Sequence, residues 1–284
     1  MVDMLSVALR AGSFVLLLQA AGIALFIVIF GERVRQSAAA MRRIGSLSAW
    51  LAMAAVIGHY VLQAGRMAGD LSGVQSAQLQ RIALHSSVAA AAALAILGLA
   101  LIVAGLRGAS GLAAASNVVG ATLAVVSFTL TGHTSVSPDR WFLIVALTAH
   151  VLIVAFWLGA LVPLYLATRL EPAPVAANVV AAFSLAAAWI VPGVFLAGAV
   201  LAVGLLPGLA TFARPYGQLL LVKIGGFAVL MALASMNKWR LTPALARGEP
   251  QAGAALARSI AAEYVLIACV LTATAVMTSF FSPD

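Results

Sequence analysis

The chain has 284 residues, of which 64% are hydrophobic and 8% are charged, and its mean hydropathy is +1.11. This composition excludes a soluble globular protein and predicts an all-α protein that crosses a membrane many times, because stretches near ~20 apolar residues recur along the chain. The formal charge of +8 does not indicate nucleic-acid binding, since the basic residues are scattered at expected helix ends.

Eight transmembrane helices are predicted, each long enough to cross the bilayer core. The first is expected to be retained, because the apolar run from Ala11 to Phe30 is too long for the core of a cleavable signal peptide. We expect one transmembrane domain over residues 1–284, with five helices in 1–177 and three in 178–284. The predicted spans are 11–31, 44–64, 82–106, 112–132, 141–167, 178–204, 217–240 and 255–281.

The distribution of lysine and arginine predicts how these helices are oriented, because cytoplasmic loops carry an excess of both. Ten basic residues fall at one set of helix ends: Arg33, Arg35, Arg42, Arg43, Arg107, Arg169, Lys238, Arg240, Arg247 and Arg258. Five fall at the other set: Arg10, Arg66, Arg81, Arg140 and Arg214. The first set is therefore expected to be cytoplasmic, with both termini on the outer side.

The four histidines of the chain all fall toward the side that is predicted to be outer. His59 and His150 lie inside spans, where ionisable groups are costly and usually face the bundle interior for a functional reason. His85, in the first turn of the third span, and His133, at the outer end of the fourth, are equally compatible with an ordinary interfacial role. Because neutral imidazole is the commonest metal ligand, the four side chains together predict a shared metal or haem site.

A second polar group is predicted on the last two helices. Lys223 and Asn237 are separated by nearly four helical turns and therefore share one face, and Glu263 and Met277 have the same spacing on the next helix. Antiparallel packing would bring Glu263 level with Asn237. It would place Lys223 level with Met277, so a direct ion pair between Lys223 and Glu263 is not expected. Lys223 has an alternative role, in which its side chain extends to the outer headgroups.

Several motifs in combination resemble a known family. The pieces that carry the resemblance are Phe183-Ser184, YGQLLLVK from Tyr216 to Lys223, MNKWRLTP from Met236 to Pro243, Glu263 in AAEYVL, Thr131-Gly132-His133, and His150 followed by Trp157-Leu158-Gly159. Together they resemble the copper resistance protein D family, CopD, of bacterial inner-membrane proteins.

The resemblance implies eight transmembrane helices in the bacterial inner membrane, and with the predicted orientation it puts both termini in the periplasm. It also implies copper handling, usually the movement of copper from periplasm to cytoplasm beside a periplasmic copper-carrier protein. The expected partners are therefore the lipid bilayer and such a carrier, with no nucleic acid.

Our leading hypothesis is a copper transporter and not an enzyme. Cu(I) favours imidazole and thioether ligands. The predicted metal ligands are His59, His85, His133, His150 and Met277. The residues predicted to gate the ion or to form the inner half of its route are Lys223, Trp157, Asn237 and Glu263.

Two alternatives stay open at the level of sequence. Histidines on adjacent helices could supply axial ligands for one or two b-type haems in a membrane oxidoreductase or electron carrier. The chain could also be an accessory membrane subunit whose histidines are structural. Haem would give the purified protein a strong Soret band, whereas copper would leave it nearly colourless.

Overall fold

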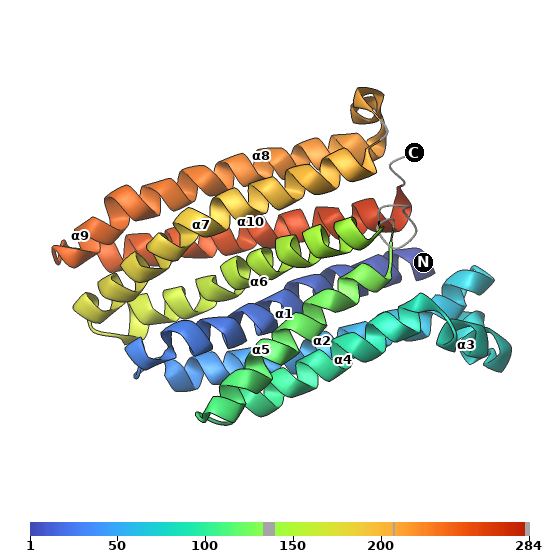
Figure 1. The fold of residues 1–284 in the computed structure, drawn as a ribbon, viewed down its shortest axis with the longest axis horizontal. Coiled ribbons are helices and arrows are strands. Elements are labelled where there is room, and N and C mark those ends of the chain that lie inside the picture. The colour runs from blue at the N-terminus through green and yellow to red at the C-terminus, as the bar shows by residue number, and fades with distance from the viewer. Residues whose placement is uncertain (133–139, 207, 282–284) are drawn as a thin grey trace.

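The computed structural model describes residues 1–132, 140–206 and 208–281, and within these ranges it contains helices and no strand (Figure 1). Eight helices of the described residues are long and apolar enough to cross a membrane, so the predicted all-α, eight-span architecture is confirmed. The start of α1 (Val2–Phe30) and the end of α10 (Ala252–Phe280) lie at the same end of the bundle. An even number of spans requires this arrangement.

The remaining elements follow in chain order. The other spans are α2 (Ala38–Ala68), α4 (Ser87–Leu106), α5 (Gly111–Val126), α6 (Arg140–Leu170), α7 (Ala173–Leu205) and α8 (Pro215–Met236). A 3-10 turn extends α5 to Leu130, and a π-helix (Asn237–Leu241) followed by α9 (Thr242–Ala246) continues α8. A short helix, α3 (Ala77–Leu84), lies between α2 and α4 and is not one of the spans.

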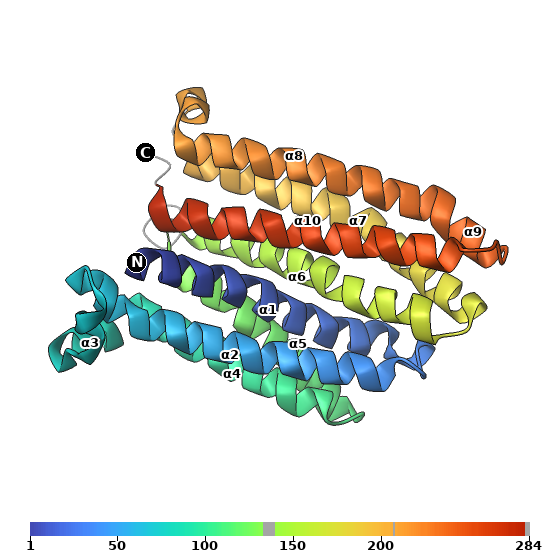
Figure 2. The same cartoon turned by 180° about the vertical axis from the view of Figure 1, so that it is seen from behind.

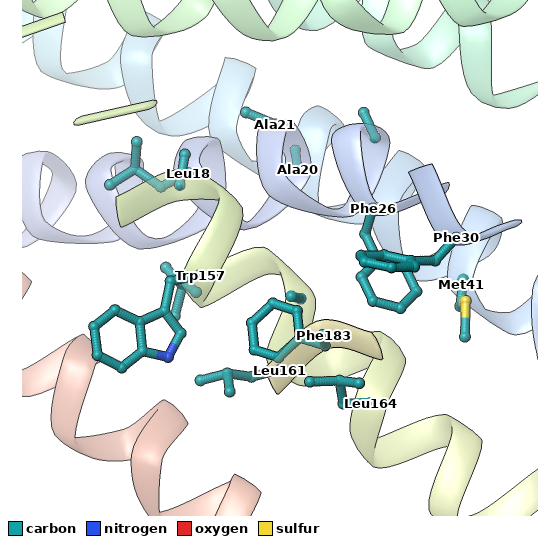
Figure 3. Packing of buried hydrophobic residues seen from close by; sticks show 14 of the residues in the cluster. Leu18, Ala20, Ala21, Phe26, Phe30, Met41, Trp157, Leu161, Leu164 and Phe183 are labelled. Atoms are coloured by element: carbon teal, nitrogen blue, oxygen red, sulfur yellow. The ribbon is translucent and has the colours of Figure 1, made fainter. Parts of the chain in front are cut away.

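α1 lies at the centre of the bundle, between α6 on one side and α2, α4 and α5 on the other (Figures 1 and 2). The most apolar segment of α1 is 56% buried, whereas the corresponding segment that contains α8 is only 6% buried. Figure 3 shows Leu18, Phe26 and Phe30 of α1 beside Leu161 and Leu164 of α6 in the buried core. The core is therefore built around α1, and α8 faces the lipid along most of its surface.

α1 and α6 approach each other closely at two glycines. A Cβ atom at Gly22 would lie 1.8 Å from the carbonyl oxygen of Ala155, and one at Gly159 would lie 2.4 Å from the Cα atom of Gly22. Small residues allow this kind of close helix crossing in membranes. At Gly12, on the same helix, the corresponding Cβ position has no atom within 4 Å.

The Gly22→Ala variant is expected to push α1 away from α6. We expect it to lose more than the ~1–3 kcal/mol typical of overpacking, because the added methyl group meets backbone atoms that cannot rotate away. The measurement is the thermal midpoint of the detergent-purified protein. Gly12→Ala is the matched control and should unfold like the wild type; equal midpoints for the two variants would contradict the close crossing.

The first span begins at Val2, earlier than the predicted start at residue 11. Charged residues hid this part of the helix in the sequence, but they have partners in the fold. Arg66 Nε pairs with Asp3 at 3.2 Å, and Arg10 donates a hydrogen bond to Ser279 Oγ of α10 at 3.2 Å. Tertiary contacts therefore stabilise a helical segment that the hydropathy of the sequence did not predict.

The third predicted span, 82–106, is divided in the structure, and this corrects the position of His85. The residue ends α3 and is exposed, so it does not lie in the first turn of a span. Ser86 is the next residue, with extended backbone angles of φ −89° and ψ 162° at the start of α4, and its hydroxyl bonds back to the Ala83 carbonyl at 2.6 Å. Serine side chains compete with helical hydrogen bonds in this way and favour helix starts.

Candidate functional site

His150 lies on α6, contacts α7 and lies near α8. Its Nδ1 atom is 3.2 Å from the carbonyl oxygen of Val194 on α7, and a Cβ atom at Gly198 would lie 3.4 Å from its Cε1 atom. Lys223 of α8 is close enough to the imidazole to interact with it electrostatically. Because a carbonyl can only accept, Nδ1 carries the proton and Nε2 keeps a free lone pair, which is the arrangement usual for metal-binding histidines.

An aromatic contact shows which residues of α6 and α8 lie at the same depth in the bundle. The rings of Trp157 and Phe227 have centroids 6.3 Å apart. His150 lies about two turns before Trp157, and Lys223 about one turn before Phe227. Both helices run inward from the predicted outer side, so His150 and Lys223 both lie in the outer half of the bundle.

A second contact shows which residues of α8 and α10 lie at the same depth, although the two helices run in opposite directions. A Cβ atom at Gly226 would lie 2.8 Å from the side chain of Val270. Lys223 precedes Gly226 by about one turn and Met277 follows Val270 by about two, so both lie outward of this contact. Met277 is buried at 4% exposure. The outer half of α6, α8 and α10 therefore holds an imidazole, an ammonium group and a thioether.

The inner half of the same three helices holds a buried carboxyl group. Glu263 of α10 is 3% exposed and accepts a hydrogen bond from the side-chain amide of Asn237, the first residue after α8. The Trp157 indole lies within hydrogen-bonding reach of this carboxyl group, and Figure 3 shows its nitrogen turned toward the pale red ribbon of α10. The predicted alignment of Glu263 with Asn237 is confirmed.

The surroundings of Glu263 hold no balancing charge. Within the described ranges, the ion pairs are Asp3–Arg66 and Arg247–Glu249, so neither Glu263 nor Lys223 is paired. Asn237 Oδ1 and Ser259 Oγ are buried without a hydrogen-bond partner, and Ser259 lies one turn before Glu263 on the same face of α10. A carboxyl group with unused oxygen acceptors beside it is suited to receive a proton or a cation inside the membrane.

The π-helix at Asn237–Leu241 positions this pair, and our sequence reasoning missed it. The Thr242 hydroxyl donates to the Asn237 carbonyl at 2.8 Å, which satisfies a backbone group in the irregular turn. Short π-helical segments are frequent at functional sites. Pro243 was the available sequence signal, because proline lacks the N–H group that a regular α-helix needs.

His59 lies apart from this group, between α2 and α1. Its Nδ1 atom is 3.2 Å from the Ser6 carbonyl oxygen, and Arg10 is close enough to interact with the ring electrostatically. Each half-buried histidine thus has a cation near it, Arg10 for His59 and Lys223 for His150. A positive charge beside an imidazole weakens the binding of a metal ion at that ring, because the two cations repel each other.

A buried polar chain links the N-terminal helices to α10, and the sequence analysis did not identify it. The Tyr264 hydroxyl donates to Gln19 Oε1, and Gln19 Nε2 donates to Ser48 Oγ at 2.5 Å. Gln19 and Ser48 are both buried. The amide of Gln19 within an otherwise apolar stretch was the signal, since polar groups inside spans are expensive unless they have partners.

The predicted pocket of four histidines is not assembled by the three that the structure describes. Among described residues, no three His, Cys, Asp or Glu side chains lie close enough together to hold a metal ion. His59 contacts α1, His85 is exposed at the end of α3, and His150 contacts α7. His133 lies outside the described residues.

The chain was compared with known protein families. Residues 1–139 match the N-terminal domain described as copper resistance protein D-like, and residues 177–277 match copper resistance protein D. The chain belongs to the copper resistance protein D family. It is therefore a multi-pass membrane protein of copper resistance, and the resemblance read from its motifs is confirmed. No curated protein and no solved structure showed a significant match to the chain.

The two matched regions divide the candidate residues of this copper resistance protein. His59, His85 and His133 fall in the first region, and Lys223, Asn237, Glu263 and Met277 fall in the second. α6 lies between the matched regions and carries His150 and Trp157. The outer and inner groups described above therefore each combine this intervening helix with the C-terminal region.

Proposed function

We propose that this copper resistance protein transports copper ions through the bacterial inner membrane, from the periplasm toward the cytoplasm. The excess of basic residues at one end of the bundle supports an orientation with both termini in the periplasm. In that orientation His150 and Met277 lie toward the periplasm, and Glu263 lies toward the cytoplasm. The observation that carries the proposal is the order of groups along the helix axes. The same three helices carry soft ligands in the outer half and a buried carboxyl group in the inner half.

His150 and Met277 are the proposed copper ligands of the outer half. Imidazole nitrogen and thioether sulfur suit Cu(I), and the bond from His150 to Val194 leaves Nε2 free to bind. Lys223 acts as the gate, because its positive charge limits how long a cation remains beside His150. An ion must bind well enough to enter and weakly enough to leave.

The other histidines are proposed to capture copper before it reaches this site. His85 is exposed and lies on a helix that is not a span, so a periplasmic copper-carrier protein could deliver the ion there. His59 is half-buried between α1 and α2, and its Nδ1 atom is 3.2 Å from both the carbonyl oxygen and the hydroxyl group of Ser6. His133 is retained as a ligand on the sequence alone.

Glu263, with Asn237 and Trp157, forms the proposed inner half of the route. A carboxylate inside the membrane stabilises a passing cation, because Coulomb attraction is strong where the dielectric constant is low. The unpartnered oxygen of Asn237 offers a second contact at the same level. The ion therefore moves from soft donors in the outer half to oxygen donors in the inner half.

Transport is tested with the purified protein in liposomes that contain a Cu(I)-sensitive dye. We expect dye signal only in vesicles that contain the protein, and only when copper is offered at the face that carries the termini. Uptake no faster than in protein-free vesicles would overturn the proposal. Wild-type copper tolerance and copper content in cells whose protein lacks all four histidines would favour an accessory subunit.

The absorbance spectrum of the purified protein separates copper transport from haem binding. Two open grooves, of about 530 and 510 Å³, contain no histidine among their described lining residues. The described histidines line neither of these grooves, and His59 and His150 contact different helices, α1 and α7. We therefore expect no Soret band. A Soret band that disappears in His150→Ala would instead identify a b-type haem protein.

A further inference from the structure

An open groove of about 530 Å³ lies between α7 and the segment formed by the π-helix and α9. Its wall is mainly apolar, with Ala177, Ala181 and Leu185 from α7 and Ala246 from α9. α7 contacts α9, and the span that contains α8 and α9 is the least buried of the eight described spans. The groove therefore opens toward the lipid at the inner end of the bundle.

A basic side chain lines the same groove. Lys238, in the π-helix, is exposed and belongs to neither ion pair of the described residues. The Asn178 side chain of α7 is also exposed there. Trp239, the next residue after Lys238, is 73% exposed, as is usual for tryptophan at the membrane–water interface. An apolar wall with a cation at its interfacial end is complementary to an amphiphile that carries a negative headgroup.

We propose that this groove binds an anionic phospholipid. One acyl chain lies along the small apolar side chains of α7, and the phosphate is held by Lys238 with the Asn178 amide. Basic pockets between transmembrane helices at the cytoplasmic side recognise anionic headgroups in this way. A zwitterionic phospholipid is bound less well, because its own cation opposes Lys238. Free phosphate is not expected to bind, since it has nothing to place on the apolar wall.

The bound lipid would touch the turn that positions the inner half of the copper route. Thr242 lines the groove, and its hydroxyl donates to the Asn237 carbonyl at 2.8 Å. Asn237 in turn donates to Glu263. Lipid binding is nevertheless a separate property of the protein and does not depend on whether copper passes through it.

The test measures lipid retained by the purified full-length protein, by native mass spectrometry, after exposure to phosphatidylglycerol or phosphatidylcholine. We expect preferential retention of phosphatidylglycerol and a higher thermal midpoint with it. Lys238→Ala should weaken this binding about fivefold, since one basic side chain near the surface contributes about 1 kcal/mol. Arg240→Ala is the matched control, because Arg240 lies in the same turn and is exposed but does not line the groove.

A second variant tests the apolar wall of the groove and does not depend on how well Lys238→Ala folds. Ala181→Trp fills the apolar wall and leaves the charge in place, so it should also release the lipid. Equal retention of the two lipids, or equal losses in Lys238→Ala and Arg240→Ala, would overturn the proposal. The second result would mean that the lipid is attracted by the general surface charge and not by the groove.

Discussion

The His150→Ala variant is expected to weaken Cu(I) binding by at least about tenfold and to stop copper uptake into liposomes. Loss of a residue that merely supports a metal ligand already costs ~10–100-fold in affinity, so loss of the ligand itself should cost no less. His150 is oriented for this role by its Nδ1 contact with Val194 at 3.2 Å. The affinity is measured by competition with a Cu(I) chelator of known strength.

Two comparisons make the His150 result specific. His85→Ala should slow uptake when copper is scarce but leave the affinity of the outer site unchanged, because His85 is exposed on α3. The thermal midpoint of His150→Ala shows whether loss of the Val194 contact has disturbed the fold. Unchanged copper stoichiometry in both His150→Ala and His133→Ala would end the idea that histidines capture the ion.

The Glu263→Gln variant is expected to reduce copper uptake by at least about tenfold, equivalent to ~1.4 kcal/mol in the barrier, while copper binding at the outer site persists. Glutamine has nearly the same size and its oxygen can still accept the hydrogen bond from Asn237, so the fold should be kept. The negative charge is lost, and with it the attraction for a cation in a low-dielectric interior. The measurement is the initial rate of dye response in liposomes.

Glu249→Gln is the control for Glu263→Gln. Glu249 pairs with Arg247 at 2.7 Å, and both side chains are exposed outside the spans. Removing that charge should leave uptake at the wild-type rate. If the Glu263→Gln protein folds and transports copper as fast as the wild type, the carboxyl group is not part of the copper route.

Much of the fold followed from hydropathy and helical periodicity. The bilayer requires long apolar helices, so the eight spans could be counted before their packing was known. The alignment of Asn237 with Glu263 followed from spacings that repeat with the helical turn and from antiparallel packing. Both features depend on local regularity, which a sequence displays directly.

Features that depend on contacts between distant segments were not predictable in the same way. The partner of His150 is a backbone carbonyl of Val194, and a backbone acceptor has no signature in the sequence. The break between α3 and α4 at His85 was not predicted, because the alanines and leucines on both sides of it continue the apolar pattern. The polar chain through Gln19 depends on Tyr264, which is remote in sequence. Such pairings depend on which helices pack side by side, and the order of the helices along the chain does not fix this.

X-ray absorption spectroscopy of Cu(I) bound to the purified protein tests the assignment of the outer site most directly. A Cys269→Ser background leaves methionine as the only source of sulfur, because Cys269 is the single cysteine of the chain. We expect imidazole nitrogen and one thioether sulfur around copper, with the sulfur lost in Met277→Leu and a nitrogen lost in His150→Ala. If the copper environment of both variants is the same as that of the wild-type protein, copper binding by His150 and Met277 is contradicted.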